Sequence, residues 1–371
     1  MALDGPGIRW WKILNLQNSI ESLLESRSSS YKFIQGDSDS VLRDFPEGSV
    51  HMAMTSPPYW MQRAYKGNSR IGLENSPEEY VKDVTKILRE LKRVLRDDGS
   101  FWLNIGDTYD GKNLCGIPWR TALSLGDDGW ILRQAIVWDK VKGNPSTSKD
   151  KLRNMYEMVF HFVKQEKYYF QLDSIRNPPG KPYTKNGKTV TATGVSGEKY
   201  RKQIESSTAL TEHEKEMALH SLEETLGKVE RREIPDFRMV IRGTQRTTHS
   251  DDPRFSGRAV ELKKRGYYIL PYHGKGTAPG DVWRIIPEDQ WRKDQHFAVY
   301  PKELCEIPIK STCPPGGIVL DPFSGTGTTV VAALELGRRG IGIEISDEYV
   351  QVAEKRVQRL FKERPLTPFT I

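Results

Sequence analysis

A glycine-bearing turn between two apolar segments constrains the fold of this chain more than any other stretch. Ile318-Val319-Leu320 is a short apolar run, and Asp321 to Thr329 (DPFSGTGTT) follows it directly. Apolar residues continue at helical spacing from Val330 to Leu336, and Gly340 to Glu344 (GIGIE) is a second apolar run that ends on an acid. Strand, glycine turn, helix and strand in this order predict one half of a Rossmann-like sheet.

The composition of the turn also predicts a class of ligand. Glycines let a ligand approach the backbone, and an acid at the end of the next strand can pair with ribose hydroxyls. The turn lacks the third glycine of the GxGxxG dinucleotide pattern, and it is not a GxxxxGK[ST] phosphate loop. We therefore expect a nucleoside ligand without a pyrophosphate.

Strands and helices also alternate through the first half of the chain. The clearest helix spans residues 77–96, with Ser76 as N-cap, Pro77 in the first turn and Asp97-Asp98-Gly99 as its stop. This alternation predicts an α/β fold with a doubly wound, Rossmann-like, mostly parallel sheet. Strands are expected at residues 31–35, 50–54, 100–105, 131–138 and 156–163, and shorter helices near 41–45 and 117–125.

The segment Thr55-Ser56-Pro57-Pro58-Tyr59-Trp60 ends the apolar run from Val50 to Met54 with a backbone that cannot continue as a helix. Proline fixes its own φ and restrains the preceding residue, so this segment has few conformations to lose on binding a substrate. A hydroxyl, fixed carbonyls and an aromatic face meet at the carboxyl end of a strand, where open α/β sheets bind ligands. We predict a site for a flat group that carries an NH2. The alternative is an edge strand followed by a proline turn.

Between residues 177 and 280 the alternation stops, and charges are sorted along the sequence. Residues 177–203 carry a net charge of +5, residues 204–236 carry −5, and residues 237–275 carry +6. A solvated surface does not require this separation, so we predict a nucleic-acid-facing insertion. Within it, Thr211 to Glu230 is expected to be a charged, exposed helix. The last stretch combines the cations Arg238, Arg242, Arg246, Arg254, Arg258, Lys263, Lys264, Arg265 and Lys275 with the rings of Phe237, Phe255, Tyr267, Tyr268, Tyr272 and His273.

Other features argue against several classes of protein. No apolar run is long enough to span a membrane and the N-terminus lacks a signal-peptide pattern, so we expect a cytoplasmic protein with no membrane partner. The spacing within residues 1–30 predicts an amphipathic helical segment. Cys115, Cys305 and Cys313 have no CxxC spacing, which favours buried or half-buried thiols over a disulfide framework or a metal site.

Together, TSPPY and DPFSGTGTT resemble motifs of the DNA amino-methyltransferases, which transfer a methyl group from S-adenosylmethionine to an exocyclic base nitrogen. The early catalytic motif, the central insertion and the late cofactor loop resemble the circularly permuted β group. The resemblance implies four parts: an N-terminal helical segment (1–30), a catalytic half (31–176), a target-recognition insertion (177–280) and an S-adenosylmethionine-binding half (281–371).

The resemblance also assigns site residues. TSPPY matches the catalytic motif, which implies catalytic roles for Ser56, Pro57, Pro58 and Tyr59. Glu344 matches the acid that binds the cofactor's ribose, and Asp37 in QGDSDS matches an acid near its adenine. The other implied cofactor-binding residues are Thr55, Asp321, Pro322, Phe323, Ser324, Gly325, Thr326, Gly327 and Thr328, and no metal ligand is implied.

Five further segments are similar to conserved blocks of the β group. With the two main motifs, they span most of 31–176 and 281–357. His296-Phe297-Ala298 departs from the His-Pro of many relatives, which affects the expected geometry of that segment alone. The segments are Gly99 to Asp107, Gly116 to Arg120, Asn154 to Val163, Gly280 to Ile285 and His296 to Leu304.

The chemistry of an exocyclic amine sets what such a site must do. Its lone pair is delocalised into the ring and its hydrogens are paired inside a duplex, so the base has to be flipped out. We expect Tyr59 to stack on the flipped base, while Ser56 and the Pro57 carbonyl bind the NH2 and steer its lone pair toward the sulfonium methyl. Positioning, desolvation and electrostatics would then supply most of the rate. Trp60 is expected either to wall the site or to belong to the core.

Within this family, serine at the first motif position usually accompanies cytosine N4 methylation, and Asp or Asn usually accompanies adenine N6 methylation. We therefore expect a site-specific, cytosine-N4 DNA methyltransferase of a restriction-modification system, with adenine N6 as the alternative. Methylation at cytosine C5 uses a cysteine that follows a proline, and none of the three cysteines does. The expected partners are double-stranded DNA, a cognate restriction endonuclease and a second copy of the chain.

Three other classes are less consistent with the sequence. A nicotinamide-dependent oxidoreductase would share the glycine turn and Glu344, but it would leave the proline motif and the basic insertion without a purpose. A non-catalytic DNA-binding protein would not need an intact SPPY. Protein glutamine methyltransferases carry a related Pro-Pro-Tyr motif after the cofactor loop, whereas here the motif precedes the loop.

Overall fold

The computed structural model describes residues 30–62, 71–142, 148–186, 188–243, 257–287 and 300–363. The chain divides into two compact units, one made of residues 1–174 and 280–371 and the other of residues 175–279. The helical segment expected at 1–30 (except Ser30) and the segment His296-Phe297-Ala298 lie outside the described residues. None of the described helices is both long and apolar enough to cross a membrane.

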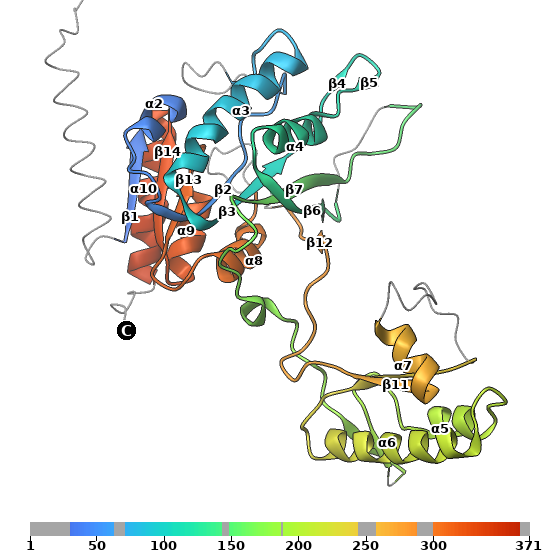
Figure 1. Cartoon of the computed structure of the whole chain (residues 1–371). Helices are drawn as coiled ribbons and strands as arrows, with labels where there is room; N and C mark the ends of the chain where they lie inside the picture. Colours follow the sequence, from blue (N-terminus) through green and yellow to red (C-terminus); the bar gives the residue numbers. More distant parts are fainter. Residues whose placement is uncertain are drawn as a thin grey trace, which may run out of the picture. The chain divides into compact units, whose positions relative to one another are not determined.

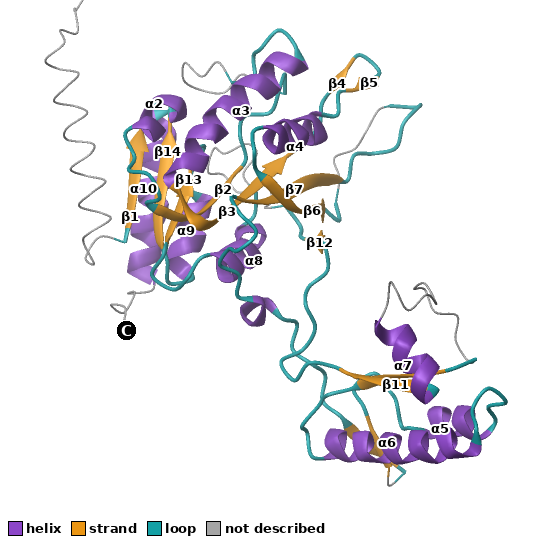
Figure 2. Ribbon diagram, in the orientation of Figure 1, coloured by secondary structure: helices purple, strands orange, loops and turns teal. Residues whose placement is uncertain are grey.

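An eight-stranded sheet forms the centre of the first unit (Figures 1 and 2). Its strand order is β1-β14-β13-β2-β3-β7-β6-β12. Among these described strands, β7 runs antiparallel to β3 and β6, and the other neighbours are parallel. The predicted α/β fold with a mostly parallel sheet is confirmed. The strands are β1 (Tyr31–Gln35), β2 (Val50–Thr55), β3 (Leu95–Ile105), β6 (Ile131–Asp139), β7 (Tyr156–Val163), β12 (Val282–Arg284), β13 (Ile318–Asp321) and β14 (Arg339–Glu344).

The strand order joins segments that are far apart in the sequence. β13 lies between β14 and β2, with Val319 opposite Met52 and Leu320 opposite Ala53. Because β1, β14, β13, β2 and β3 run in the same direction, their carboxyl ends meet at one edge of the sheet. In open α/β sheets this edge binds ligands.

Helices pack on both faces of the sheet (Figure 2). α2 (Ser38–Arg43), α3 (Pro77–Val94) and α4 (Ile117–Asp127) share one core with Ala53 of β2. α8 (Lys302–Thr312) and α9 (Thr328–Glu335) share another core with Met54 of the same strand, and α10 (Asp347–Glu363) packs with α9 and β1. Successive side chains of β2 thus enter opposite layers, as the two-residue period of a strand requires. A short hairpin of β4 (Tyr109–Asp110) and β5 (Asn113–Leu114) precedes α4.

The boundary between α3 and β3 differs from the sequence prediction. α3 ends at Val94, and β3 begins at Leu95 rather than at Ser100. Val50 pairs with Leu95 but Met52 pairs with Ser100, so the residues between them form an irregularity opposite His51. Asp97-Asp98-Gly99 therefore lies within β3, where the extra residues form a bulge. It does not separate the helix from the strand.

The second unit has a hydrophobic core of its own. α6 (Glu212–Glu230) opens with a capping box between Thr211 and Glu214, and its residues Leu222 and Val229 are buried against β10. The expectation of a helix exposed along its length was wrong for this face. The other elements here are the 3-10 helix η1 (Leu172–Ile175) at the boundary, β8 (Tyr183–Lys185), β9 (Lys188–Val190), α5 (Glu198–Glu205), β10 (Phe237–Ile241), α7 (Gly257–Arg265) and β11 (Tyr267–Pro271), with β8 paired to β9 and β10 to β11.

Candidate functional site

The predicted site residues gather at the carboxyl-terminal edge of the sheet. Thr55 is the last residue of β2, Asp321 the last of β13 and Glu344 the last of β14. Asp37 follows β1 by two residues, and the proline motif begins at Ser56. The parallel strands thus bring the early and late motifs of the chain together.

Asp321 is the centre of a buried cluster of hydroxyl groups. Its Oδ1 accepts hydrogen bonds from Thr55 Oγ1 at 2.6 Å and from the N–H of Phe323 at 3.1 Å. Its Oδ2 accepts from Thr329 Oγ1 at 2.5 Å and from Tyr300 Oη at 3.1 Å. Burial raises the pKa of the Asp321 carboxyl, and these hydrogen bonds oppose the shift because they favour the ionised form.

This cluster joins two residues that the sequence assigned to the cofactor. Thr55 is 0% and Asp321 is 2% exposed, and their side chains bind each other. The bond links the strand that precedes the proline motif to the strand that precedes the glycine turn. Direct contact of either side chain with a cofactor stays a prediction.

The two glycines of the turn are required for different reasons. Both have a positive φ, +51° at Gly325 and +78° at Gly327. A Cβ on Gly327 would lie 2.6 Å from Cζ of Phe33, so this glycine lets the turn pack on β1. A Cβ on Gly325 would meet no atom of the described structure within 4 Å, so its backbone is open to an approaching ligand.

Glu344 fixes the conformation of the same turn. Its Oε2 accepts the N–H of Gly325 at 2.9 Å, and its Oε1 accepts the N–H of Ser346 at 2.8 Å. Burial raises the pKa of the Glu344 carboxyl, against the effect of these amides. Each carboxylate oxygen retains capacity for a second donor, such as a ribose hydroxyl.

Four of the remaining turn residues contact the protein itself, whereas the Ser324 hydroxyl has no hydrogen-bond partner in the described structure. Pro322 accepts a hydrogen bond from Ser38 on its carbonyl, and Phe323 packs against the core. Thr326 and Thr328 accept hydrogen bonds from Arg356 of α10 on their hydroxyls, each at 3.0 Å. Ser324 Oγ is buried and has no hydrogen-bond partner within the described part of the chain. A buried hydroxyl without a partner beside an open glycine fits a polar ligand.

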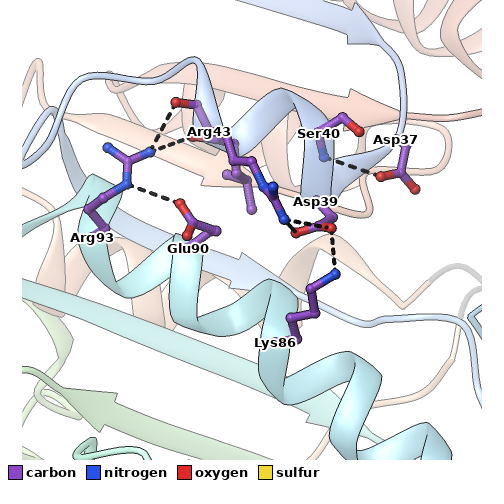
Figure 3. A network of polar contacts seen from close by, with 8 residues as sticks. Asp37, Asp39, Ser40, Arg43, Lys86, Glu90 and Arg93 are labelled. Carbon is purple, nitrogen blue, oxygen red and sulfur yellow. Dashed lines mark hydrogen bonds and ion pairs between the residues drawn. The ribbon is translucent and has the colours of Figure 1, made fainter.

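Asp37 has a structural contact of its own at this edge. Figure 3 shows its Oδ1 accepting the N–H of Ser40 at 3.2 Å, which makes Asp37 the N-cap of α2. At the other end of α2, Arg93 donates to the carbonyls of Leu42 and Phe45, both at 2.8 Å. The short helix is held at both ends, and the Asp37 side chain is exposed at the end nearer the site.

The proline motif takes part in a second network, which is half buried. Ser56 Oγ donates to Tyr59 Oη at 3.2 Å, and Tyr59 Oη donates to Glu157 Oε2 at 2.7 Å. Asn104 Nδ2 donates to the same oxygen at 3.1 Å, and Lys140 forms an ion pair with Glu157 Oε1. The network therefore joins the residues after β2 to β3, to β7 and to the residue that follows β6.

Packing holds the motif in place around these hydrogen bonds. A Cβ on Gly106 would lie 2.6 Å from Cε2 of Tyr59, so the glycine after β3 lets the ring pack closely. The carbonyl of Pro58 accepts from Tyr80 Oη at 2.9 Å. Trp60 is 6% exposed, belongs to the main core and donates to the Glu74 carbonyl at 2.9 Å, which favours the core role over a role in the site.

Outside the two motifs, sequence reasoning missed five residues of these networks: Asn104, Lys140, Glu157, Tyr300 and Arg356. Two of them carried a signal, because Glu157 and Asn104 are polar side chains inside the apolar strands YEMVFHFV and FWLNI. A polar group in such a strand has to be paired. Lys140, Tyr300 and Arg356 carried no local signal, since only the fold brings them to their partners.

The basic residues of the second unit have different positions. Arg242 pairs with Glu214 at 2.6 Å and donates to the Ala209 carbonyl at 2.7 Å, so this half-buried side chain ties the end of β10 to α6. The cations Arg258, Lys263, Lys264 and Arg265 of α7 are exposed. Arg246, Arg254 and Phe255 lie outside the described residues.

Comparison with known proteins identifies the family. Residues 50–355 match the model of a family described as DNA methylase. The type II methyltransferase M.SfiI of Streptomyces fimbriatus is 31% identical over 91% of this chain and 93% of its own length. M.SmaI of Serratia marcescens is 28% identical over 93% of this chain and 97% of its own.

A solved structure, the PvuII DNA methyltransferase (cytosine-N4-specific), superposes with a TM-score of 0.54 at 18% identity over 90% of this chain and 92% of that one, which shows a shared fold. The matched region contains the proline motif, the glycine turn and the two networks that support them. The chain is therefore a DNA methyltransferase and belongs to the DNA methylase family.

Proposed function

We propose that this chain is a site-specific, S-adenosylmethionine-dependent methyltransferase that methylates the exocyclic N4 amine of a flipped-out cytosine, as the modification enzyme of a restriction-modification system. The observation that carries the proposal is the bond between Thr55 and Asp321. It fixes the Ser56–Tyr59 motif beside the Asp321–Thr328 turn, at the edge of the sheet where ligands bind. Serine at the first motif position favours cytosine, because the resemblance associates Ser56 with N4 methylation.

The turn fits the nucleoside portion of the cofactor. Gly325 gives access to the backbone, Ser324 offers a buried hydroxyl without a partner in the described structure, and Glu344 keeps carboxylate lone pairs for ribose hydroxyls. Asp37 is exposed nearby and would approach the adenine. When bound, S-adenosylmethionine supplies an electrophilic methyl group on a sulfonium. The chain's own residues then only have to hold the amine in line with it.

The proline motif supplies the groups that position the base. Tyr59 is locked by Glu157 and by close packing on Gly106, so little freedom is lost when a base stacks on its ring. Ser56 is half-buried beside it and would hydrogen-bond the amine, together with the Pro57 carbonyl. Pro57 and Pro58 keep these groups at fixed positions.

The second unit is proposed to recognise the DNA sequence. The exposed cations of α7 would contact phosphates, which bind without regard to sequence and set the register on the duplex. The proposed parts are those inferred from the sequence: 31–176, 177–280 and 281–371, with 1–30 ahead of them. The position of β13 between β14 and β2 supports a permuted, β-group order, in which the catalytic motif precedes the cofactor turn.

The partners follow from the same proposal. Two relatives are named type II methyltransferases, which supports a cognate restriction endonuclease beside double-stranded DNA. The dimer expected from the resemblance stays a prediction.

Sequencing of DNA from cells that express the chain, by a method that separates N4-methylcytosine from N6-methyladenine, tests the proposal. The expected result is N4-methylcytosine at one short motif, and none in cells that express Ser56→Ala at the same level. Methyladenine at a motif would replace cytosine by adenine in the proposal. DNA without any modified base would refute it.

A further inference from the structure

In the network around Tyr59, the number of available protons determines which group donates and which accepts in each hydrogen bond. Glu157 pairs with Lys140 through Oε1 and accepts from Asn104 Nδ2 and Tyr59 Oη through Oε2. A carboxylate can only accept, and a phenol has one proton to donate. Tyr59 Oη lies 2.7 Å from Glu157 Oε2 and 3.4 Å from Asn104 Oδ1, so it uses its proton on the nearer, charged acceptor, Glu157.

The direction of the hydrogen bond between Ser56 and Tyr59 follows from this assignment. Ser56 Oγ lies 3.2 Å from Tyr59 Oη, and the Tyr59 proton is already committed to Glu157. Ser56 must be the donor in this contact. Its own proton points toward Tyr59, and the lone pairs of Oγ are left to face the site as acceptors.

We propose that Glu157 is a positioning residue that sets the direction of the hydrogen bonds from Ser56 through Tyr59. Ser56 then presents an acceptor to the target base and selects an amine over a carbonyl. Lys140 and Asn104 hold the carboxylate in place. The inference rests on the proposed function, in which Ser56 contacts the flipped base.

The chemistry of bases makes this polarity a specificity filter. Cytosine carries an NH2 donor at C4, and adenine carries one at C6, whereas uracil, thymine and hypoxanthine carry a carbonyl oxygen at the same positions. An acceptor on Ser56 pairs with the amine and faces a carbonyl oxygen with no shared proton. Sites that hydrogen-bond a substrate group reject the analogue that lacks it, because buried polar groups then stay unpaired.

Replacing the Glu157 carboxylate by an amide should reverse the direction of the hydrogen bonds that run between Ser56, Tyr59 and residue 157. In Glu157→Gln, Lys140 still requires an acceptor and retains the amide oxygen, which turns the amide NH2 toward Tyr59 and Asn104. The Asn104 amide then has to turn over, so that its Oδ1 accepts from residue 157 and its Nδ2 faces Tyr59 Oη. Tyr59 must then accept from residue 157 and donate to Ser56, and the Ser56 proton turns outward. The size and shape of the side chain hardly change, so the direction of hydrogen bonding is the main difference.

The experiment measures discrimination as a ratio. Full-length protein with S-adenosylhomocysteine is titrated with two duplexes that carry the motif found by sequencing, one with the target cytosine and one with uracil in its place. If sequencing reveals an adenine target, adenine and hypoxanthine are used. Dividing the variant's ratio of dissociation constants by that of the wild type removes the easier opening of the mismatched pair.

The expected result is a loss of about tenfold in amine preference for Glu157→Gln, equivalent to one reversed hydrogen bond. Glu166→Gln is the matched control, because Glu166 is an exposed glutamate just beyond β7. Its ratio should equal that of the wild type. Tyr59→Phe keeps the ring but removes the hydroxyl that links Ser56 to Glu157, so it should also lose the preference for an amine. Adding Glu157→Gln to Tyr59→Phe should then change the ratio no further.

Three results decide the matter. A folded Glu157→Gln protein with wild-type discrimination overturns the proposal, as do Tyr59→Phe and Glu157→Gln effects that simply add. If Glu157→Gln fails to fold by thermal melting, Tyr59→Phe decides alone, and a wild-type ratio in that variant overturns the proposal. Failure of the proposed function would be recognised separately, since wild-type protein would then leave no methylated base in DNA.

Discussion

Thr55 and Ser56 are consecutive residues, yet they belong to hydrogen-bond networks of different kinds. Thr55 binds Asp321 in a cluster that is sealed between strands and between the sheet and α9. Ser56 belongs to a half-buried network that contains the ion pair of Lys140 with Glu157. Because extended backbone directs successive side chains to opposite sides, one strand end can serve both networks.

The difference between the two networks concerns what each can still bind. Both oxygens of the Asp321 carboxylate receive two donors each from the protein itself. In the proposed arrangement, the Ser56 network ends on a hydroxyl whose remaining lone pairs face the site. A polar cluster that is complete stabilises the fold, whereas one that stops short of completion is available to a substrate.

Asp321→Ala should be the most damaging change to the fold. It leaves the hydroxyls of Thr55, Tyr300 and Thr329 buried without their shared acceptor. We expect a loss of about 3–5 kcal/mol in the free energy of unfolding, measured by urea denaturation. Asp150→Ala removes an exposed carboxylate and should change stability by less than about 0.5 kcal/mol. Equal losses in the two variants would remove the distinction between the networks.

Ser56→Ala should show the opposite pattern. Removing the hydroxyl takes away one hydrogen bond to the target amine, and we expect kcat to fall by roughly 10²-fold to 10³-fold. Unfolding in urea should match that of the wild type to within about 0.5 kcal/mol, since Ser56 is half-buried and its partner Tyr59 keeps Glu157. A stability loss comparable to that of Asp321→Ala would assign Ser56 to the structural network instead.

Thr55→Val tests the neighbouring residue with a change of similar size. It removes one donor to Asp321 and leaves the other three. We expect a loss of about 1–2 kcal/mol in stability. The pairing of β13 with β2 still holds the two motifs together, so kcat and the affinity for S-adenosylmethionine should stay near those of the wild type. Calorimetric titration with the cofactor provides the second measurement. A large drop in cofactor affinity would restore the direct cofactor contact predicted from the sequence.

The opposite end of β2 offers the smallest of the four effects. His51 Nδ1 accepts the N–H of Ile318 at 3.1 Å, and desolvation, with the nearby charges of Arg96 and Arg339, lowers the pKa of His51 to about 4. A depressed folded-state pKa means that the stabilisation is complete above pH 6.5 and is lost as the pH falls toward 4.

In His51→Gln, which keeps an acceptor but does not titrate, this part of the pH dependence should disappear. The expected difference is on the order of 1 kcal/mol after solvent screening, from urea unfolding at several pH values. Parallel curves for the two proteins would show that His51 contributes nothing to the pH dependence.

The sequence predicted the sheet edge well because its signals are local. A strand that ends at Thr55, a glycine turn that begins at Asp321 and an acid at Glu344 can each be recognised within a few residues. Parallel strands then place these ends together without further information. The polar groups that complete the networks are set by strand pairing, which local patterns do not encode. Glu157 reaches Tyr59 only because β7 runs antiparallel beside β3.

The same reasoning explains which partners of the motif residues the sequence does not reveal. Thr326 and Thr328 are assigned to the cofactor from the GTGTT motif, and their hydroxyls each accept a hydrogen bond from Arg356 of the distant α10. Their contact with the cofactor stays a prediction. Arg242 looks like a phosphate contact in a basic stretch, but Glu214 neutralises it. In each case a residue more than 25 positions away supplies the partner, so inspection of the motif alone assigns the side chain to a ligand.

The position of β13 between β14 and β2 has a consequence for how the chain folds as it is made. The contact between Thr55 and Asp321 spans 266 residues, so β2 cannot acquire this neighbour until most of the chain has left the ribosome. Until then the apolar strand Val50–Thr55 has an unpaired edge, which is prone to associate with other chains. The middle of the sheet is thus among the last parts to close, and slow, concentration-dependent refolding is expected from this strand order.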